Sequence, residues 1–136
     1  MEKYFTVEEA NRTLPLVRRI VSDIVATYDE FRRRLEEARI LDPEVAAQLS
    51  RRRELEAEMR QLTDRVNGFI SELEKIGVLF KGVEEGLIDF YGKLDGRPVF
   101  LCWKLGEESV EWWHELDTGY VGRRRLPTHL LSLGGS

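Results

Sequence analysis

Apolar side chains recur at alternating spacings of three and four residues through the first 76 positions of the chain. This spacing makes one face of a helix apolar, so it predicts two long helices rather than strands. The first stripe comprises Val7, Ala10, Leu14, Val17, Val21, Ile24, Tyr28, Phe31, Leu35 and Ala38. The second comprises Val45, Gln48, Arg52, Leu55, Met59, Leu62, Val66, Phe69, Leu73 and Ile76. The short connection at 40–42 requires the helices to run antiparallel, as a hairpin over 6–76.

The ends of both helices carry local signals. Thr6 and Glu9 have the spacing of a capping box, in which each side chain satisfies a backbone N–H group of the first turn. Asp42-Pro43 is typical of an N-cap followed by a first-turn proline, and Gly77 is typical of a C-terminal stop. These signals place the start and end of the hairpin.

Pro15 interrupts the first helix, because proline cannot donate to the carbonyl of Asn11 and its ring collides with that turn. We expect either a kink or a short first turn, with Thr13 capping the main helix. Asn11 is expected to bond the carbonyl groups that the kink releases.

Beyond the second helix the apolar period changes to two, which is typical of strands. The segments Leu87–Leu94 and Arg97–Leu105 flank Asp95-Gly96, the two-residue signal of a type I′ turn. A turn of this length fixes the register of the two strands. It places Asp89 opposite Cys102.

A third strand is expected at Val110–Glu115, folding back so that Trp103 lies opposite Trp112. A helix over 108–116 is the competing interpretation of this segment. Tyr120-Val121 is expected to begin a short fourth strand.

Together these elements predict an α+β protein, in which a long antiparallel helical hairpin packs at its base on a small β-meander. Three or four antiparallel strands cannot stand alone, so their apolar face should cover the helices. We expect a single domain over 1–126, with the hairpin at 6–76 and the meander at 78–122. Residues 127–136 are expected to form a loosely ordered tail.

Composition and charge narrow the class of protein. The chain has 136 residues, a net charge of −4 and one cysteine, which rules out an internal disulfide. No apolar run is long enough for a membrane span and no signal peptide opens the chain, so we expect a cytoplasmic protein with no membrane partner. Residues 77–122 carry nine acidic side chains against four basic ones, which makes nucleic acid an unfavourable partner there.

The most concentrated polar chemistry is at His114, Glu115 and Asp117. The expected register places His114 beside Leu101 on the apolar sheet face and Glu115 on the opposite face. Asp117 lies past the strand end and could turn back toward His114, with Asp89 as another carboxylate. One histidine with carboxylates suits Mg²⁺ or Mn²⁺ better than Zn²⁺. The alternative is a hydrogen-bonded core histidine followed by an Asp117 turn.

Asp89 and Cys102 are candidates on the second sheet face. A half-buried Asp89 needs a hydrogen-bonding partner, so it ranks next after His114. Cys102 is interpreted as a small buried hydrophobe, because a reactive thiol needs a base and His114 is expected to point away. Trp113 is expected to be exposed, while the other two tryptophans pack in the core.

The hairpin tip is rich in arginine. Residues 29–56 hold seven arginines, which suggests an RNA-binding arm, but they also hold eight acids. This mixture predicts a surface of ion pairs exposed to solvent.

Several segments resemble one bacterial protein family. They are Phe5–Asn11 with Leu14-Pro15, Gly86–Phe90, Leu101–Glu107, Trp113–Tyr120 and Gly122-Arg123. The chain resembles the family called "domain of unknown function 2203" over residues 4–126. The resemblance implies a small prokaryotic cytoplasmic protein, and it brings no activity, substrate or catalytic residue.

The favoured hypothesis is a non-enzymatic interaction or assembly protein whose helical arm pairs with itself or with another protein. The apolar stripe widens at the base of the hairpin, which favours a homodimer, and no cofactor is then expected. The alternative is a divalent-metal-binding protein or metal-dependent enzyme centred on His114, Asp117 and Asp89. A third hypothesis is an RNA-associated arm.

Overall fold

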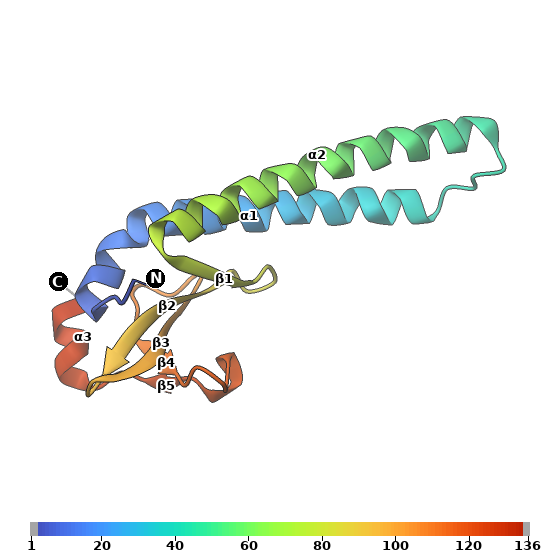
Figure 1. Ribbon diagram of the computed structural model, residues 1–136. Coiled ribbons are helices and arrows are strands. Elements are labelled where there is room, and N and C mark those ends of the chain that lie inside the picture. Colours follow the sequence, from blue (N-terminus) through green and yellow to red (C-terminus); the bar gives the residue numbers. More distant parts are fainter. Residues whose placement is uncertain (1–2, 135–136) are drawn as a thin grey trace.

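The computed structural model describes residues 3–134 of the chain. Helix α1 (Val7–Arg39) and helix α2 (Ala46–Ile76) run antiparallel and pack against each other. Figure 1 shows this hairpin as a long arm that begins above a sheet and extends well past it. The predicted helical hairpin is therefore confirmed.

The start of α1 follows its sequence signal, whereas the start of α2 does not. The Thr6 hydroxyl accepts a hydrogen bond from the Glu9 N–H at 3.0 Å, and the Thr6 N–H donates to Glu9 Oε1 at 2.9 Å. The predicted N-cap at Asp42 is wrong. Asp42 Oδ1 accepts from the Glu44 N–H at 2.9 Å within a separate turn, and α2 begins only after it, with Val45 as its N-cap.

Helix α1 continues through Pro15, so the short separate first turn is not formed. Two side chains bond carbonyl groups of the preceding turn: Thr13 Oγ1 donates to Ala10 at 2.7 Å, and Asn11 Nδ2 donates to Val7 at 3.1 Å. The N-terminal part of α1, blue in Figure 1, leaves the line of the rest of the helix. This bend agrees with the kink predicted from the missing proline donor.

The sheet contains five antiparallel strands in sequential order. They are β1 (Val78–Gly82), β2 (Leu87–Leu94), β3 (Arg97–Lys104), β4 (Trp112–His114) and β5 (Arg124–Arg125). Asp95 and Gly96 have φ values of 52° and 77°, as the type I′ turn requires, and the pairing of Asp89 with Cys102 is confirmed. The fourth strand expected at Tyr120-Val121 is wrong, because Tyr120–Gly122 forms a 3₁₀ helix.

Strand β4 pairs with β3 one residue away from the predicted register. His114 lies opposite Phe100, and Trp112 lies opposite Cys102 rather than Trp103. Only residues 112–114 of the predicted strand at 110–115 pair with β3. The loop between β3 and β4 is therefore longer than the loop of a regular hairpin, and it does not fix the predicted register. A shift of one residue moves every side chain of a strand to the other sheet face. The prediction of His114 on the apolar face is therefore wrong.

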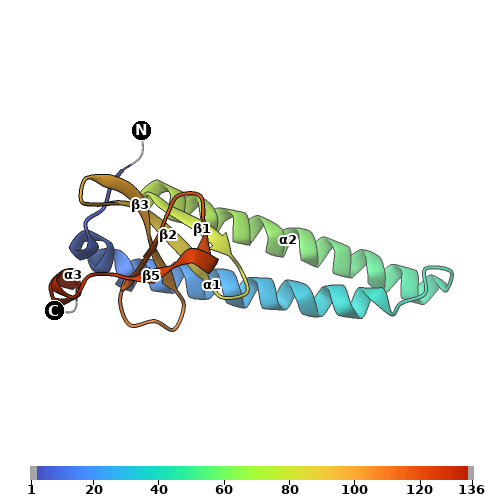
Figure 2. The same ribbon diagram turned by 90° about the horizontal axis from the view of Figure 1, so that it is seen from below.

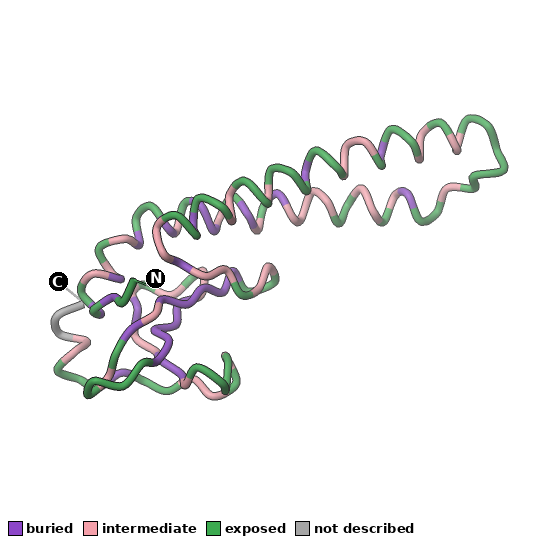
Figure 3. Tube along the Cα trace, in the orientation of Figure 1, coloured by how far each residue is buried: buried purple, intermediate pink, exposed green. Residues whose placement is uncertain are grey.

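The hydrophobic core lies between the base of the hairpin and one face of the sheet. Its largest fully buried side chains include Trp103, Phe90, Ile24, Leu73, Ile88 and Leu101. Figure 2 shows the strands crossing one end of the hairpin, and Figure 3 shows that the purple, buried positions gather there. Along the rest of the arm the two helices pack against each other.

The C-terminal segment adds a helix where the sequence predicted a loosely ordered tail. Helix α3 (Thr128–Gly134) packs against α1, and Leu126 just before it is buried in the core. Residues 135–136 of the predicted tail lie outside the described residues. Among residues 3–134, no helix combines the length and apolar character needed to cross a lipid bilayer.

Candidate functional site: a buried Asp–Cys–His cluster

Three adjacent strands bring three chemically active side chains together on the sheet face that points away from the helices. Asp89 comes from β2, Cys102 from β3 and His114 from β4. A carboxylate oxygen, the thiol sulfur and an imidazole nitrogen all lie within 4.8 Å of one another. The three residues are 2%, 0% and 2% exposed, so this is an interior site.

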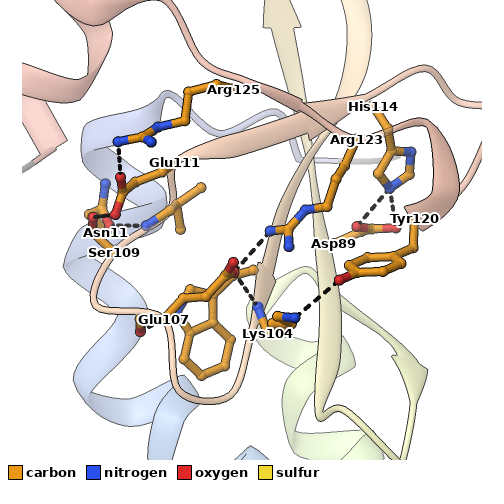
Figure 4. Close-up of polar contacts among 12 residues, drawn as sticks. Asn11, Asp89, Lys104, Glu107, Ser109, Glu111, His114, Tyr120, Arg123 and Arg125 are labelled. Carbon is orange, nitrogen blue, oxygen red and sulfur yellow. Dashed lines mark hydrogen bonds and ion pairs between the residues drawn. The ribbon is translucent and has the colours of Figure 1, made fainter.

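His114 is held at both ring nitrogens. Nδ1 lies 2.7 Å from the carbonyl oxygen of Glu115, and Nε2 lies 3.0 and 3.1 Å from the two carboxylate oxygens of Asp89 (Figure 4). A carbonyl oxygen can only accept, so Nδ1 carries a proton and donates it. The imidazole and the carboxylate lie within hydrogen-bond distance of each other, so each buried group has a partner, and this pairing lowers the cost of burying them.

Burial controls the protonation of the other two groups. Desolvation raises the pKa of Asp89, although the neighbouring His114 works in the opposite direction. Desolvation, together with the Asp89 carboxylate, raises the pKa of the Cys102 thiol to about 12. The thiol is therefore protonated near neutral pH, and it is a poor nucleophile in this state.

A polar layer covers this face of the sheet and is supplied by the segment after β4. The Arg123 guanidinium donates to Glu107 Oε1 at 2.9 Å and lies over the rings of Trp112 and Tyr120. The Tyr120 hydroxyl accepts from Lys104 Nζ at 3.1 Å, and this bond lowers the pKa of Tyr120. In the view of Figure 4 the Arg123 guanidinium lies between Glu107 and Asp89, and the Tyr120 ring lies next to Asp89.

The cluster combines the predicted candidates differently from the sequence hypothesis. His114 and Asp89 lie together, but Cys102 rather than Asp117 joins them, and the expectation that His114 points away from Cys102 is wrong. Asp117 is exposed in the turn after β4. These placements follow from the one-residue register shift of β4.

Trp113 and Glu115, two other predicted candidates, contact residues outside the cluster. Trp113 is only 9% exposed and belongs to the hydrophobic core, so the expectation of an exposed ring is wrong. The Glu115 side chain forms an ion pair with Arg97, while its carbonyl oxygen orients His114. Neither of these side chains belongs to the Asp–Cys–His cluster.

Sequence reasoning missed the residues that build the surroundings of the cluster. Glu107 accepts from the Lys104 N–H at 2.9 Å, and its carbonyl accepts from the Trp103 indole at 3.0 Å, which fixes the loop after β3. Asn11 Oδ1 accepts from the Val110 N–H at 2.7 Å, which ties the same loop to α1. The sequence does not indicate this hydrogen bond, because its donor is the backbone N–H of Val110, a group that almost every residue has.

Comparison with known proteins gives one match. No curated protein and no solved structure matches the chain. A family model described as "Uncharacterized conserved protein (DUF2203)" matches residues 3–126, which include both long helices and all five strands. The chain therefore belongs to this uncharacterised family, as the resemblance in its sequence segments predicted.

Proposed function

We propose that this protein is an assembly module that forms a homodimer through its helical arm. The observation that carries the proposal is an apolar groove at the point where the arm leaves the sheet. Its lining residues are Tyr28, Phe31, Leu62, Thr63, Val66 and Val83. Helices α1 and α2 supply the walls, and the turn after β1 closes one end through Val83.

The groove is incompletely covered by the described residues. The rings of Tyr28 and Phe31 stack with a centroid distance of 6.1 Å, yet both residues remain half-exposed, as does Val66. Two helices pack only one seam between them, so apolar residues flanking that seam need a third element. An arm from a second copy would supply it.

A second copy suits the surface charge of the arm. Residues 1–76 carry 14 basic and 16 acidic side chains, so two identical arms meet without strong net repulsion. A twofold dimer presents the same apolar patch from both subunits, which satisfies both grooves at once. Pairing of the two arms would then make a four-helix arrangement.

Four of the seven arginines in residues 29–56 form ion pairs with acids of the same arm, which supports protein assembly rather than RNA binding. Arg51 makes a bidentate contact with Glu37, at 2.7 and 3.2 Å, and a further contact with Glu54 at 3.1 Å. Arg33 pairs with Asp29. Phosphate groups would have to displace these carboxylates.

The test is the absolute mass of the protein in solution, measured by light scattering on a sizing column over a wide range of concentrations. The wild type is expected to be a dimer. A double variant, Phe31→Gln with Val66→Gln, removes the groove lining and is expected to raise the dimer dissociation constant at least about tenfold, a change of about 1.4 kcal/mol.

The matched control is Ile40→Gln, the same kind of change at an apolar residue that is 81% exposed at the end of α1. Ile40→Gln is expected to leave the dimer unchanged, and circular dichroism should show equal helix content in all variants. A wild type that stays monomeric at every concentration contradicts the proposal. A double variant that dimerises as tightly as the control contradicts it as well.

A further inference from the structure

We propose that Asp89, Cys102 and His114 form a binding site for a divalent transition metal, with Zn²⁺ as the cation that the ligand set favours. The three ligand atoms lie within 4.8 Å of one another on three adjacent strands. One thiolate, one imidazole and one carboxylate are typical zinc ligands, at metal–ligand distances of about 2.0 to 2.3 Å. This inference is independent of the proposed dimer.

The register of β4 changes which metal the site suits. A site of His114 with Asp117 and Asp89 would offer one nitrogen and several oxygens, which favours Mg²⁺ or Mn²⁺. In the structure Asp117 is exposed and lies outside the cluster, and the third ligand atom is the buried sulfur of Cys102. A sulfur ligand shifts the preference toward zinc and other transition metals.

His114 is already oriented as a metal-bound histidine would be. Its Nδ1 lies 2.7 Å from the Glu115 carbonyl oxygen, which fixes the tautomer with the proton on Nδ1. The unprotonated Nε2 of that tautomer points at Asp89 and the interior of the cluster. Metal-ligating histidines generally donate their other ring N–H to a carbonyl or carboxylate in this way.

Charge balance permits a divalent cation in this buried place. Metal binding replaces the proton of the Cys102 thiol, which leaves to solvent. The thiolate and the Asp89 carboxylate then offset the two positive charges of M²⁺, and His114 is a neutral ligand. The metal-bound cluster is therefore neutral, and no net charge is buried with it.

Three protein ligands leave one position of a tetrahedral site for another ligand. The layer above the cluster comes from a single segment, in which Tyr120 and Arg123 are held by Lys104 and Glu107. Within residues 3–134, Arg123 Nε is a buried nitrogen without a hydrogen-bond partner. The Arg123 guanidinium interacts electrostatically with Cys102, so this unpartnered N–H belongs to the layer beside the cluster.

The experiment uses the full chain without a histidine tag, purified in chelator and then dialysed free of it. Co²⁺ is added as a spectroscopic probe, since cobalt bound to a thiolate gives an intense near-ultraviolet charge-transfer band and tetrahedral cobalt gives visible bands. The expected result is one Co²⁺ per chain with both signals, displaced by one equivalent of Zn²⁺. Elemental analysis of the dialysed zinc form gives the stoichiometry independently.

Cys102→Ser is expected to abolish the charge-transfer band and to weaken binding at least about tenfold. Asp117→Asn is the control, because it removes the nearby carboxylate that lies outside the cluster, and it is expected to bind as the wild type does. Thermal unfolding of both variants establishes that they fold. Absence of stoichiometric Co²⁺ or Zn²⁺ binding by folded wild type overturns the proposal, as does an unchanged band in Cys102→Ser.

Discussion

His114 on β4 and Asp89 on β2 meet across the intervening strand β3, with Nε2 of the imidazole 3.0 Å from a carboxylate oxygen. Both side chains are almost fully buried, and each satisfies the other. A buried pair of this kind adds little to the free energy of unfolding compared with an apolar pair of the same volume. Removal of one partner is costly, because it leaves a polar or charged group without a bond in the interior.

Asp89→Ala is therefore expected to lower the free energy of unfolding by about 3 to 5 kcal/mol, because His114 Nε2 loses its only described partner. Asp89→Asn is expected to cost less, since its side-chain amide group can donate a hydrogen bond to Nε2. Urea denaturation of metal-free protein measures both values. Asp117→Ala, at an exposed turn position, serves as control and is expected to change stability by less than about 0.5 kcal/mol. Equal stability of Asp89→Ala and this control would contradict the assignment.

The link between Asn11 and Val110 is the second expected source of stability. Val110 is 1% exposed, and its N–H donates to Asn11 Oδ1 at 2.7 Å. Asn11→Ala leaves this donor without an acceptor, and the expected loss in the free energy of unfolding is about 1 to 3 kcal/mol. Asn67→Ala, on an exposed position of α2, is the matched control and should be close to neutral. Hydrogen exchange at the Val110 amide should also become faster only in the Asn11 variant.

The hairpin and the β2–β3 register could be predicted because their determinants are local in sequence. The capping box spans four residues, and the Asp95-Gly96 turn alone fixes which residues of β2 and β3 face each other. The prediction for the start of α2 is wrong because Asp42 stabilises a turn with Glu44 instead of the helix. An aspartate side chain can accept from a backbone N–H group in a turn as well as at a helix N-terminus, so its presence does not by itself locate the start of a helix.

The arrangement of the site could not be predicted, although His114, Asp89 and Cys102 were all candidates. Their grouping depends on the register of β4, and that register depends on the loop from 105 to 111. Asn11, which is 99 residues from Val110, holds this loop. The apolar periodicity of the sequence does not predict a contact between residues so far apart in the chain. A register error of one residue places every side chain of the strand on the opposite face of the sheet.

Two glycines give a matched pair of predictions about packing. A Cβ atom at Gly92 in β2 would lie 2.7 Å from the Leu101 side chain, whereas one at Gly68 in α2 would meet nothing within 4 Å. Gly92→Ala is expected to lower the free energy of unfolding by about 1 to 3 kcal/mol through overpacking. Gly68→Ala is expected to raise it by about 0.5 to 1 kcal/mol, because alanine is the better helix former. Chemical denaturation measures both, and equal effects of the two substitutions would contradict the packing described around Leu101.

The capping box at the start of α1 predicts a pH dependence. The hydrogen bond from the Thr6 N–H is the main cause that holds the pKa of Glu9 below its ordinary value. Because the folded pKa is the lower one, the ionised carboxylate stabilises the fold above the ordinary glutamate range. This contribution is lost as the pH falls through the lowered pKa.

Thr6→Ala removes the hydroxyl that accepts from the Glu9 N–H, and it is expected to lower the free energy of unfolding by about 1 kcal/mol. Alanine keeps the backbone N–H that is the main cause of the low Glu9 pKa, so this pKa should rise only by the smaller part that the Thr6 side chain contributes, which a carboxyl titration by nuclear magnetic resonance measures directly. Thr13→Ala is the matched control, since this hydroxyl in the same helix donates to the Ala10 carbonyl and makes no bond with Glu9. A Glu9 pKa that changes as much in Thr13→Ala as in Thr6→Ala would contradict the role of the Thr6 side chain in the capping box.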